Sequence, residues 1–277
     1  MDIEHILDRI TEPLSEVPGV VGVVLGGSRA RGTPGVDSDI DIGIYYDLDE
    51  FDLAKVSSIA TALDDAHRED IITPLGGWGE WVNGGGWLVI DGIHVDFIFR
   101  DIRRVEQVIN DCIAGKITAH YHWGHPHAYI NAMYMGELAI CKILIDKNGR
   151  LQALKAKTKP YPPNMKRAIV ESFISEAEFS FMHAQYNADK DDVYYVAGHV
   201  FRVISCLNQV LFALNEEYCI NEKKAVKMIA NFPKAPLKYK ERVDEIFSLL
   251  SSKSDDSKVA CDKLKALVEE VKFLAGK

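Results

Sequence analysis

The first hundred residues alternate between two hydrophobic spacings. Apolar residues recur at intervals of three and four in some segments, which predicts helices with one buried face. In other segments they form short continuous runs or alternate with polar residues, as in strands. The turn Asp91-Gly92 separates two apolar runs and predicts a β-hairpin. The expected strands are 20–25, 40–44, 87–90 and 93–99, and the expected helices are 3–10, 53–63 and 105–113.

The chain changes character after a group of prolines at positions 160, 162 and 163. Helical spacing dominates from there, and no strand pattern competes with it. We expect helices at 165–186, 193–214, 243–250 and 259–274, and a further one in the apolar segment 129–144. The predicted fold class is therefore α+β, with an N-terminal domain at 1–159 and an α-helical bundle at 160–277.

Composition places the chain among ordinary globular proteins. Its 277 residues are 47% hydrophobic and 26% charged, which excludes disordered and low-complexity classes. Lysine and arginine number 32 against 41 aspartates and glutamates, so the net charge is −9. An acidic surface binds phosphate backbones poorly, so we do not expect nucleic acid as a partner.

The cysteines and the N-terminus bear on location. Five cysteines lie far apart without a CxxC motif, which favours reduced thiols over a disulfide framework. The opening sequence MDIEHILDRI has acids where a signal peptide needs a basic start. The apolar run at 17–25 is too short to cross a bilayer. We therefore expect a cytoplasmic protein without a membrane partner.

Three aspartates are the leading candidates for chemistry. Asp39 and Asp41 are two residues apart on a predicted strand, so both carboxylates leave the same face. Asp96 lies between Val95 and Phe97 on another predicted strand. If these strands pair, three carboxylates converge and need cations to offset their repulsion. Oxygen ligands favour Mg²⁺, and two such ions can clamp the oxygens of a phosphoryl or nucleotidyl transfer.

A glycine-rich turn supplies the second half of this candidate site. Gly26 and Gly27 follow the first predicted strand and let the backbone approach a phosphate closely. Ser28 can donate its hydroxyl to a phosphate oxygen, and Arg29 or Arg31 can add a charge-assisted contact. Gly27, Ser28, Arg29 and Arg31 are accordingly the candidate nucleotide-binding residues.

The order Gly-Gly-Ser, Asp-Ile-Asp and a later apolar-Asp-apolar strand resembles the DNA polymerase beta nucleotidyltransferase superfamily over about residues 20–100. The resemblance implies a short mixed β-sheet with flanking helices and Mg²⁺-dependent nucleotidyl transfer with release of pyrophosphate. It assigns Gly27 and Ser28 to the triphosphate. It also assigns Asp39 and Asp41 to both metal ions, and Asp96 as third ligand and occasional base.

Length and element order are similar to those of small two-domain bacterial enzymes such as the kanamycin and lincosamide nucleotidyltransferases. That resemblance implies a carboxylate from the helical half as general base near the acceptor hydroxyl. Glu176 is the preferred candidate because it lies mid-helix among apolar neighbours, and Glu178 is nearly as good. An ordinary surface glutamate is an equally good interpretation of either residue.

The leading hypothesis is an enzyme that transfers AMP from ATP, or another nucleoside monophosphate, to a hydroxyl of a small molecule. An aminoglycoside-like or lincosamide-like antibiotic is the expected acceptor class. One alternative is a protein-modifying, AMPylating enzyme of the antitoxin-like kind. Another is a catalytically silent nucleotide-binding protein. A homodimer is compatible with the sequence, which does not identify the oligomeric state.

Two further segments have open interpretations. Residues 76–87 hold six glycines and three tryptophans, and they either stack on a base or sugar-like acceptor or cover the sheet. The histidines of 120–127 match no standard zinc spacing, so we prefer a polar loop to a zinc site.

Overall fold

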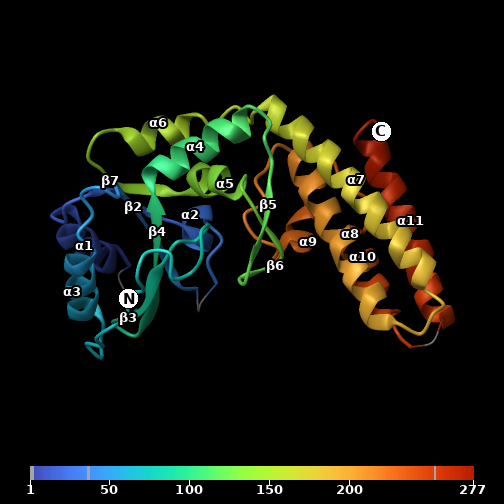
Figure 1. The fold of residues 1–277 in the computed structure, drawn as a ribbon, viewed down its shortest axis with the longest axis horizontal. Helices are drawn as coiled ribbons and strands as arrows, with labels where there is room; N and C mark the ends of the chain where they lie inside the picture. The colour runs from blue at the N-terminus through green and yellow to red at the C-terminus, as the bar shows by residue number, and fades with distance from the viewer. Residues whose placement is uncertain (1–2, 36–37, 253) are drawn as a thin grey trace. The chain divides into compact units, whose positions relative to one another are not determined.

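The computed structural model describes residues 3–35, 38–252 and 254–277. The chain divides into two compact units (Figure 1). The N-terminal unit holds the residues up to Asn110 and Tyr134–Pro160, and the helical unit holds Asp111–Met133 and Tyr161–Lys277. The units are thus not two consecutive segments, as the predicted domains 1–159 and 160–277 are. The later crossing, at Pro160, lies beside the predicted boundary, whereas Asp111–Met133 joins the helical unit.

A mixed five-stranded sheet forms the centre of the N-terminal unit. Its strands are β1 (Val20–Leu25), β2 (Ile40–Tyr46), β3 (Gly85–Ile90), β4 (Ile93–Asp101) and β7 (Lys142–Asp146). The strand order is β3-β4-β2-β1-β7. Strands β2 and β4 run parallel, and the other neighbouring pairs are antiparallel. This arrangement confirms the predicted short mixed sheet with flanking helices.

Alternation along β2 separates the core from the site. Ile40, Ile42 and Ile44 are fully buried and belong to the main hydrophobic cluster of the unit. Asp41 lies between them and therefore leaves the opposite face. The helices of this unit are α1 (Ile3–Ser15), α2 (Gly27–Arg31), α3 (Leu53–Leu63), α4 (Ile102–Ile113), α5 (Met133–Ile140) and α6 (Arg150–Ala156), with α4 and α5 crossing the unit limits.

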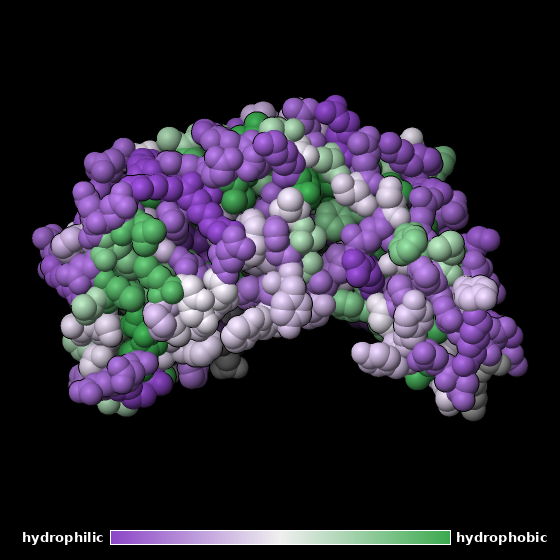
Figure 2. Space-filling model, in the orientation of Figure 1, coloured by the Kyte–Doolittle hydropathy of each residue, from purple (hydrophilic) through white to green (hydrophobic). Residues whose placement is uncertain are grey.

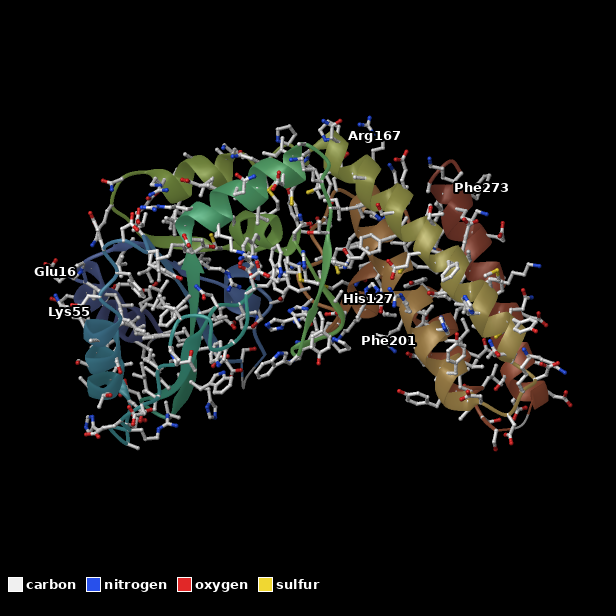
Figure 3. All side chains as sticks on the ribbon, viewed as in Figure 1. Glu16, Lys55, His127, Arg167, Phe201 and Phe273 are labelled. Atoms are coloured by element: carbon white, nitrogen blue, oxygen red, sulfur yellow. The ribbon has the colours of Figure 1, made fainter. Side chains whose placement is uncertain are left out.

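Local side-chain contacts fix how these helices meet the sheet. The Asp52 carboxylate accepts a hydrogen bond from the Lys55 backbone N–H at 2.9 Å, which caps the start of α3. The Lys55 ammonium points back to the end of α1 and donates to the carbonyl of Glu16 at 2.6 Å (Figure 3). Asp91 and Gly92 have φ values of 52° and 76°, the left-handed conformations that a two-residue hairpin turn requires.

The helical unit consists of α7 (Pro163–Asn187), α8 (Val193–Leu214), α9 (Ala225–Ile229), α10 (Tyr239–Ser248) and α11 (Ser254–Leu274), with a hairpin of β5 (Ala119–His122) and β6 (His125–Ile130). This confirms the predicted helical bundle. Among the described residues, α8 alone has the length and hydropathy of a membrane span, but 72% of its apolar window is buried in the protein. Hydrophilic side chains cover most of the surface visible in Figure 2.

The predicted helix at 129–144 is wrong at both ends. Residues 125–130 form β6, and Lys142–Asp146 forms β7, so only α5 between them is helical. Strand β7 pairs with β1 at the edge of the sheet. Pairing with a strand more than a hundred residues away overrides the local apolar spacing, which is ambiguous in short segments.

Candidate active site

Strands β2 and β4 bring the predicted carboxylates together. Asp41 and Asp96 are direct register partners in the parallel pair. Neighbouring strands lie about 4.8 Å apart, so these two side chains stand next to each other on one face. Asp39 lies two residues before Asp41, immediately ahead of β2, and is exposed. The structure thus gathers the three aspartates that the sequence singled out.

The three carboxylates repel one another in this position. Partial burial of Asp96, with Asp41 and Asp39 beside it, raises the pKa of its carboxyl from 3.8 to about 6. His94, two residues earlier on the same strand, acts in the opposite direction. Bringing three negative charges to one face therefore costs free energy unless cations bind there.

The turn between β1 and α2 lies directly against this cluster. The Gly26 N–H donates to the backbone carbonyl of Asp41 at 2.8 Å. Gly27 has a φ of 59°, and a Cβ atom there would lie 1.7 Å from Oδ2 of Asp41. Both the backbone conformation and the close approach require glycine. The glycine-rich turn and the carboxylates consequently form one continuous surface.

Arg29 binds the backbone just before β2. Its guanidinium donates to the carbonyl of Asp39 at 3.0 Å and also to the carbonyl of Ser38. These bonds fix the backbone that carries the Asp39 carboxylate. Ser28 and Arg31 lie in the same short helix α2. The predicted contacts of Ser28, Arg29 and Arg31 with a nucleotide remain predictions.

The donor set suits a divalent cation. Asp41 and Asp96 offer carboxylate oxygens on one half-buried face, and the exposed Asp39 lies just before Asp41. Hard oxygen ligands are those that Mg²⁺ prefers. Burial and the neighbouring carboxylates raise the pKa of Asp96, so a bound cation would stabilise its ionised form. The three residues therefore fit the predicted role of metal ligands.

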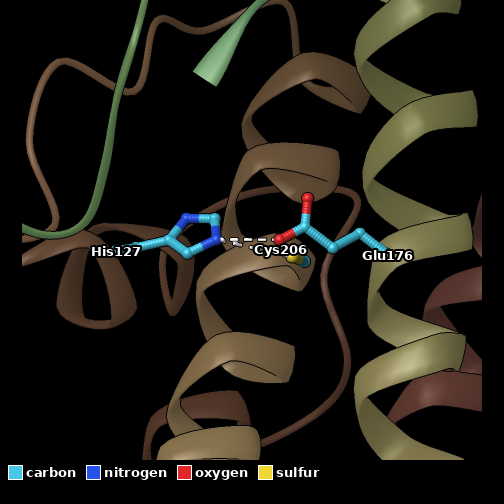
Figure 4. Close-up of side chains that lie close together, drawn as sticks. All are labelled: His127, Glu176 and Cys206. Carbon is cyan, nitrogen blue, oxygen red and sulfur yellow. Dashed lines mark hydrogen bonds and ion pairs between the residues drawn. The ribbon is translucent and has the colours of Figure 1, made fainter. Parts of the chain in front are cut away.

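Glu176, the candidate general base, belongs to helix α7 of the helical unit (Figure 4). Its carboxylate accepts hydrogen bonds from His127 at 3.2 Å and from Arg202 at 2.6 Å. These two bonds lower the pKa of Glu176 to about 2, against the opposing effect of burial. A carboxylate held this acidic is a weak base near neutral pH. Glu178, the other candidate, forms an ion pair with Lys272 at 2.6 Å.

His127, Glu176 and Cys206 place ligand atoms within 4.8 Å of one another (Figure 4). His127 lies 3.9 Å from the Cys206 sulfur as well as 3.2 Å from Glu176. His125, from the same histidine-rich segment, bonds to Glu222 at 2.9 Å. Hydrogen bonds within the helical unit account for the closeness of these side chains, without a metal ion between them.

The segment 76–87, expected either to stack on a base or sugar-like acceptor or to cover the sheet, brings one tryptophan next to the carboxylates. Trp87 is the direct register partner of Asp96 in the antiparallel β3–β4 pair, so both lie on the same face. The sequence contains a signal for this pairing. A two-residue turn at Asp91-Gly92 pairs Ile90 with Ile93, and the same register pairs Trp87 with Asp96.

The chain is similar to solved structures at low sequence identity. A structural neighbour is a nucleotidyltransferase-like protein from Exiguobacterium sibiricum 255-15, with 13% identity, 99% of this chain and 77% of that chain covered, and a TM-score of 0.47. An aminoglycoside 6-adenyltransferase from Bacillus subtilis shares 12% identity over 100% of this chain and 92% of that chain, with a TM-score of 0.34. A search of curated proteins gave no match.

The family comparison is specific to the N-terminal part. The model of the nucleotidyltransferase domain matches residues 7–115. The match includes β1 to β4 and the turn after β1, and it confirms the predicted superfamily. The chain therefore carries a nucleotidyltransferase domain and is a nucleotidyltransferase.

Proposed function

We propose that this enzyme transfers AMP from ATP to a hydroxyl group of a small molecule, in a Mg²⁺-dependent reaction that releases pyrophosphate. The observation that carries the proposal is the register pair Asp41–Asp96, with Asp39 two residues before Asp41. A site that only binds a nucleotide does not need three carboxylates that repel one another. Metal ions bound by three carboxylates suit the chemistry of nucleotidyl transfer.

The chain's own residues divide the work of the reaction. Gly27 and Ser28 receive the triphosphate, with Arg31 as a further cation. Asp39, Asp41 and Asp96 would hold two Mg²⁺ ions, which supply charge stabilisation for the attacking and leaving oxygens. Arg29 keeps Asp39 in place through the carbonyls of Ser38 and Asp39.

The reaction is a single substitution at the α-phosphorus of ATP. The acceptor oxygen forms a bond to the α-phosphorus, the bond from that phosphorus to the bridging oxygen breaks, and pyrophosphate leaves. The hydroxyl proton passes to a carboxylate base. Asp96 is the candidate within the N-terminal unit, and Glu176 is the weaker base because its pKa is about 2.

The acceptor we propose is a small molecule of the aminoglycoside-like or lincosamide-like kind. The acidic net charge of −9 suits a cationic acceptor. All five cysteines are buried thiols outside disulfide bonds, which supports the reducing cytoplasm as the compartment.

The test follows the fate of the label in ATP. The enzyme is incubated with Mg²⁺ and ATP labelled at either the α- or the γ-phosphorus, together with aminoglycosides, lincosamides or cell lysate. The proposal predicts α-label, and no γ-label, on a small molecule. Label from γ on the acceptor would indicate phosphoryl transfer instead. Labelled protein bands in lysate, without a labelled small molecule, would replace the proposed acceptor by a protein.

A further inference from the structure

A row of three side chains crosses the sheet from the metal-ligand candidates to an exposed aromatic ring. Asp41 on β2 faces Asp96 on β4, and Asp96 faces Trp87 on β3. All three therefore lie on the same face of the sheet. The Trp87 side chain is 63% exposed, which is unusual for the largest apolar residue of a folded chain.

Trp78 enlarges this exposed ring. Its indole stacks on Trp87 with ring centroids 4.8 Å apart and planes inclined by 26°. Gly85, two residues before Trp87 on β3, makes room for it, because a Cβ atom at Gly85 would lie 2.7 Å from the Trp78 ring. The two tryptophans form one aromatic surface next to Asp96, which we call the Trp78–Trp87 platform.

The rest of the glycine-rich segment holds the platform in place. Trp81 is buried, with the Arg104 guanidinium over its ring at 4.4 Å and Tyr134 donating to its carbonyl at 2.7 Å. Asn83 accepts a hydrogen bond from the Gly76 N–H at 2.8 Å. The segment thus has one tryptophan that anchors it in the unit and two that it presents beside the carboxylates. A role in covering the sheet accounts for the buried position of Trp81. It does not account for the exposed position of Trp87 or for the stacking of Trp78 on it.

Strand order indicates which substrate this platform faces. The turn at Gly27, which we propose to bind the phosphates, follows β1, and β1 neighbours β2 on one side. Trp87 is on β3, which lies beyond β4 on the other side of the carboxylates. In a substitution at phosphorus, the attacking and leaving oxygens lie on opposite sides. In the proposed function pyrophosphate leaves toward Gly27, so the acceptor would approach from the side of Trp87.

We infer that the Trp78–Trp87 platform is the acceptor subsite and takes a ring-bearing cationic molecule, whose ring and positive charge lie against the exposed aromatic surface of the two tryptophans. An aromatic face attracts both the apolar face of a ring and a cation. The chain's net charge of −9 adds a preference for positive charge over a neutral sugar. This inference rests on the proposed function, because it assumes that the carboxylates are the reaction centre.

The test measures binding separately from turnover. Kanamycin serves as a ring-bearing polycation, spermidine as a polycation without a ring, and maltose as a ring without charge. Isothermal titration calorimetry compares the wild type with Trp87→Ala, Trp87→Phe and Trp78→Ala. Trp123→Ala is the matched control, since Trp123 is 75% exposed and belongs to the helical unit. Each protein is also titrated with Mg²⁺-ATP.

We expect kanamycin to bind the wild type more tightly than spermidine or maltose, and Trp87→Ala to weaken it by at least about tenfold. Trp87→Phe should retain most of the affinity, Trp78→Ala should lose part of it, and Trp123→Ala and all Mg²⁺-ATP affinities should be unchanged. Unaltered kanamycin binding in Trp87→Ala would overturn the inference. So would the absence of kanamycin binding in a wild type that binds ATP. Loss of ATP binding in Trp87→Ala would mean that the platform holds the nucleotide. Failure of the proposed function would appear separately, as α-label that never leaves ATP.

Discussion

Gly27 and Asp41 are so close that no side chain fits between them. A Cβ atom on Gly27 would lie 1.7 Å from the Asp41 carboxylate oxygen Oδ2. This contact joins the proposed phosphate-binding turn to the proposed metal ligands. A side chain added at Gly27 would therefore displace the Asp41 carboxylate, so the turn and the carboxylate depend on each other for their positions.

Gly27→Ala should abolish most of the transferase activity, because the new methyl group displaces Asp41. We expect a loss of at least about a hundredfold in kcat/KM, as for other misplacements of reacting groups. Gly32→Ala is the matched control, since Gly32 also has a positive φ, 77°, but a Cβ atom there meets nothing within 4 Å. Equal losses in the two variants would show that backbone strain, and not the contact with Asp41, is responsible. Steady-state kinetics of pyrophosphate release provides the measurement.

Arg29→Lys should lower kcat more than it raises the KM for ATP. A guanidinium donates to the carbonyls of Ser38 and Asp39 at once, and a single ammonium does not reproduce that geometry. We expect a loss of about tenfold in kcat from the less ordered Asp39. Arg9→Lys, which alters a surface ion pair with Asp91, is the control. A higher KM for ATP with unchanged kcat would instead identify Arg29 as a phosphate ligand, as the sequence predicts.

Mg²⁺ should raise the melting temperature of the protein by about 2–4 °C at millimolar concentration, because it binds the folded carboxylate cluster. Asp96→Asn should raise the melting temperature in EDTA, since it removes one of three repelling charges, and it should lose most of the response to Mg²⁺. Asp70→Asn, a change at an exposed position, should keep the full response. Differential scanning fluorimetry measures all three proteins. A Mg²⁺ response that survives in Asp96→Asn would place the ion elsewhere.

Asp64→Asn should destabilise the protein by about 2 kcal/mol at neutral pH. The Arg68 guanidinium holds the pKa of the buried Asp64 carboxyl well below its usual range, and the Val89 N–H adds to this effect. A carboxyl with a depressed pKa stabilises the fold above its unfolded-state pKa, about 4, and loses that contribution as the pH falls. Urea unfolding should therefore show a difference between wild type and variant that shrinks from pH 7 to pH 3. A constant difference would contradict the assignment.

The parts of the fold that follow from the sequence are those set by local signals. Alternation around Asp41 identified β2 and its two faces, and Asp91-Gly92 identified the β3–β4 hairpin. Helix α8 begins and ends where the apolar spacing does, after the cap at Asp192. The same signals predict Asp41 and Asp96 on two strands whose pairing would bring the carboxylates together, whereas Asp39 lies just ahead of β2 and not on the strand itself.

The parts that do not follow from the sequence depend on distant partners. Strand β7 resembles the end of an apolar helix until it pairs with β1. The histidine-rich segment forms a hairpin whose His125 bonds to Glu222, nearly a hundred residues later. The sequence places the charged Glu176 among apolar neighbours on a helix, which suggests a functional role. Its hydrogen-bond partners His127 and Arg202 come from other elements, β6 and α8. No periodicity within a short window encodes such contacts.

Pyrophosphate release with Mg²⁺-ATP and the acceptor panel tests the central claim most directly when wild type is compared with Asp41→Asn and Asp70→Asn. The account predicts acceptor-dependent release in the wild type and in Asp70→Asn, and a loss of at least about a thousandfold in Asp41→Asn. Retained activity in Asp41→Asn would contradict it, because the Asp41–Asp96 pair would then not be the reaction centre.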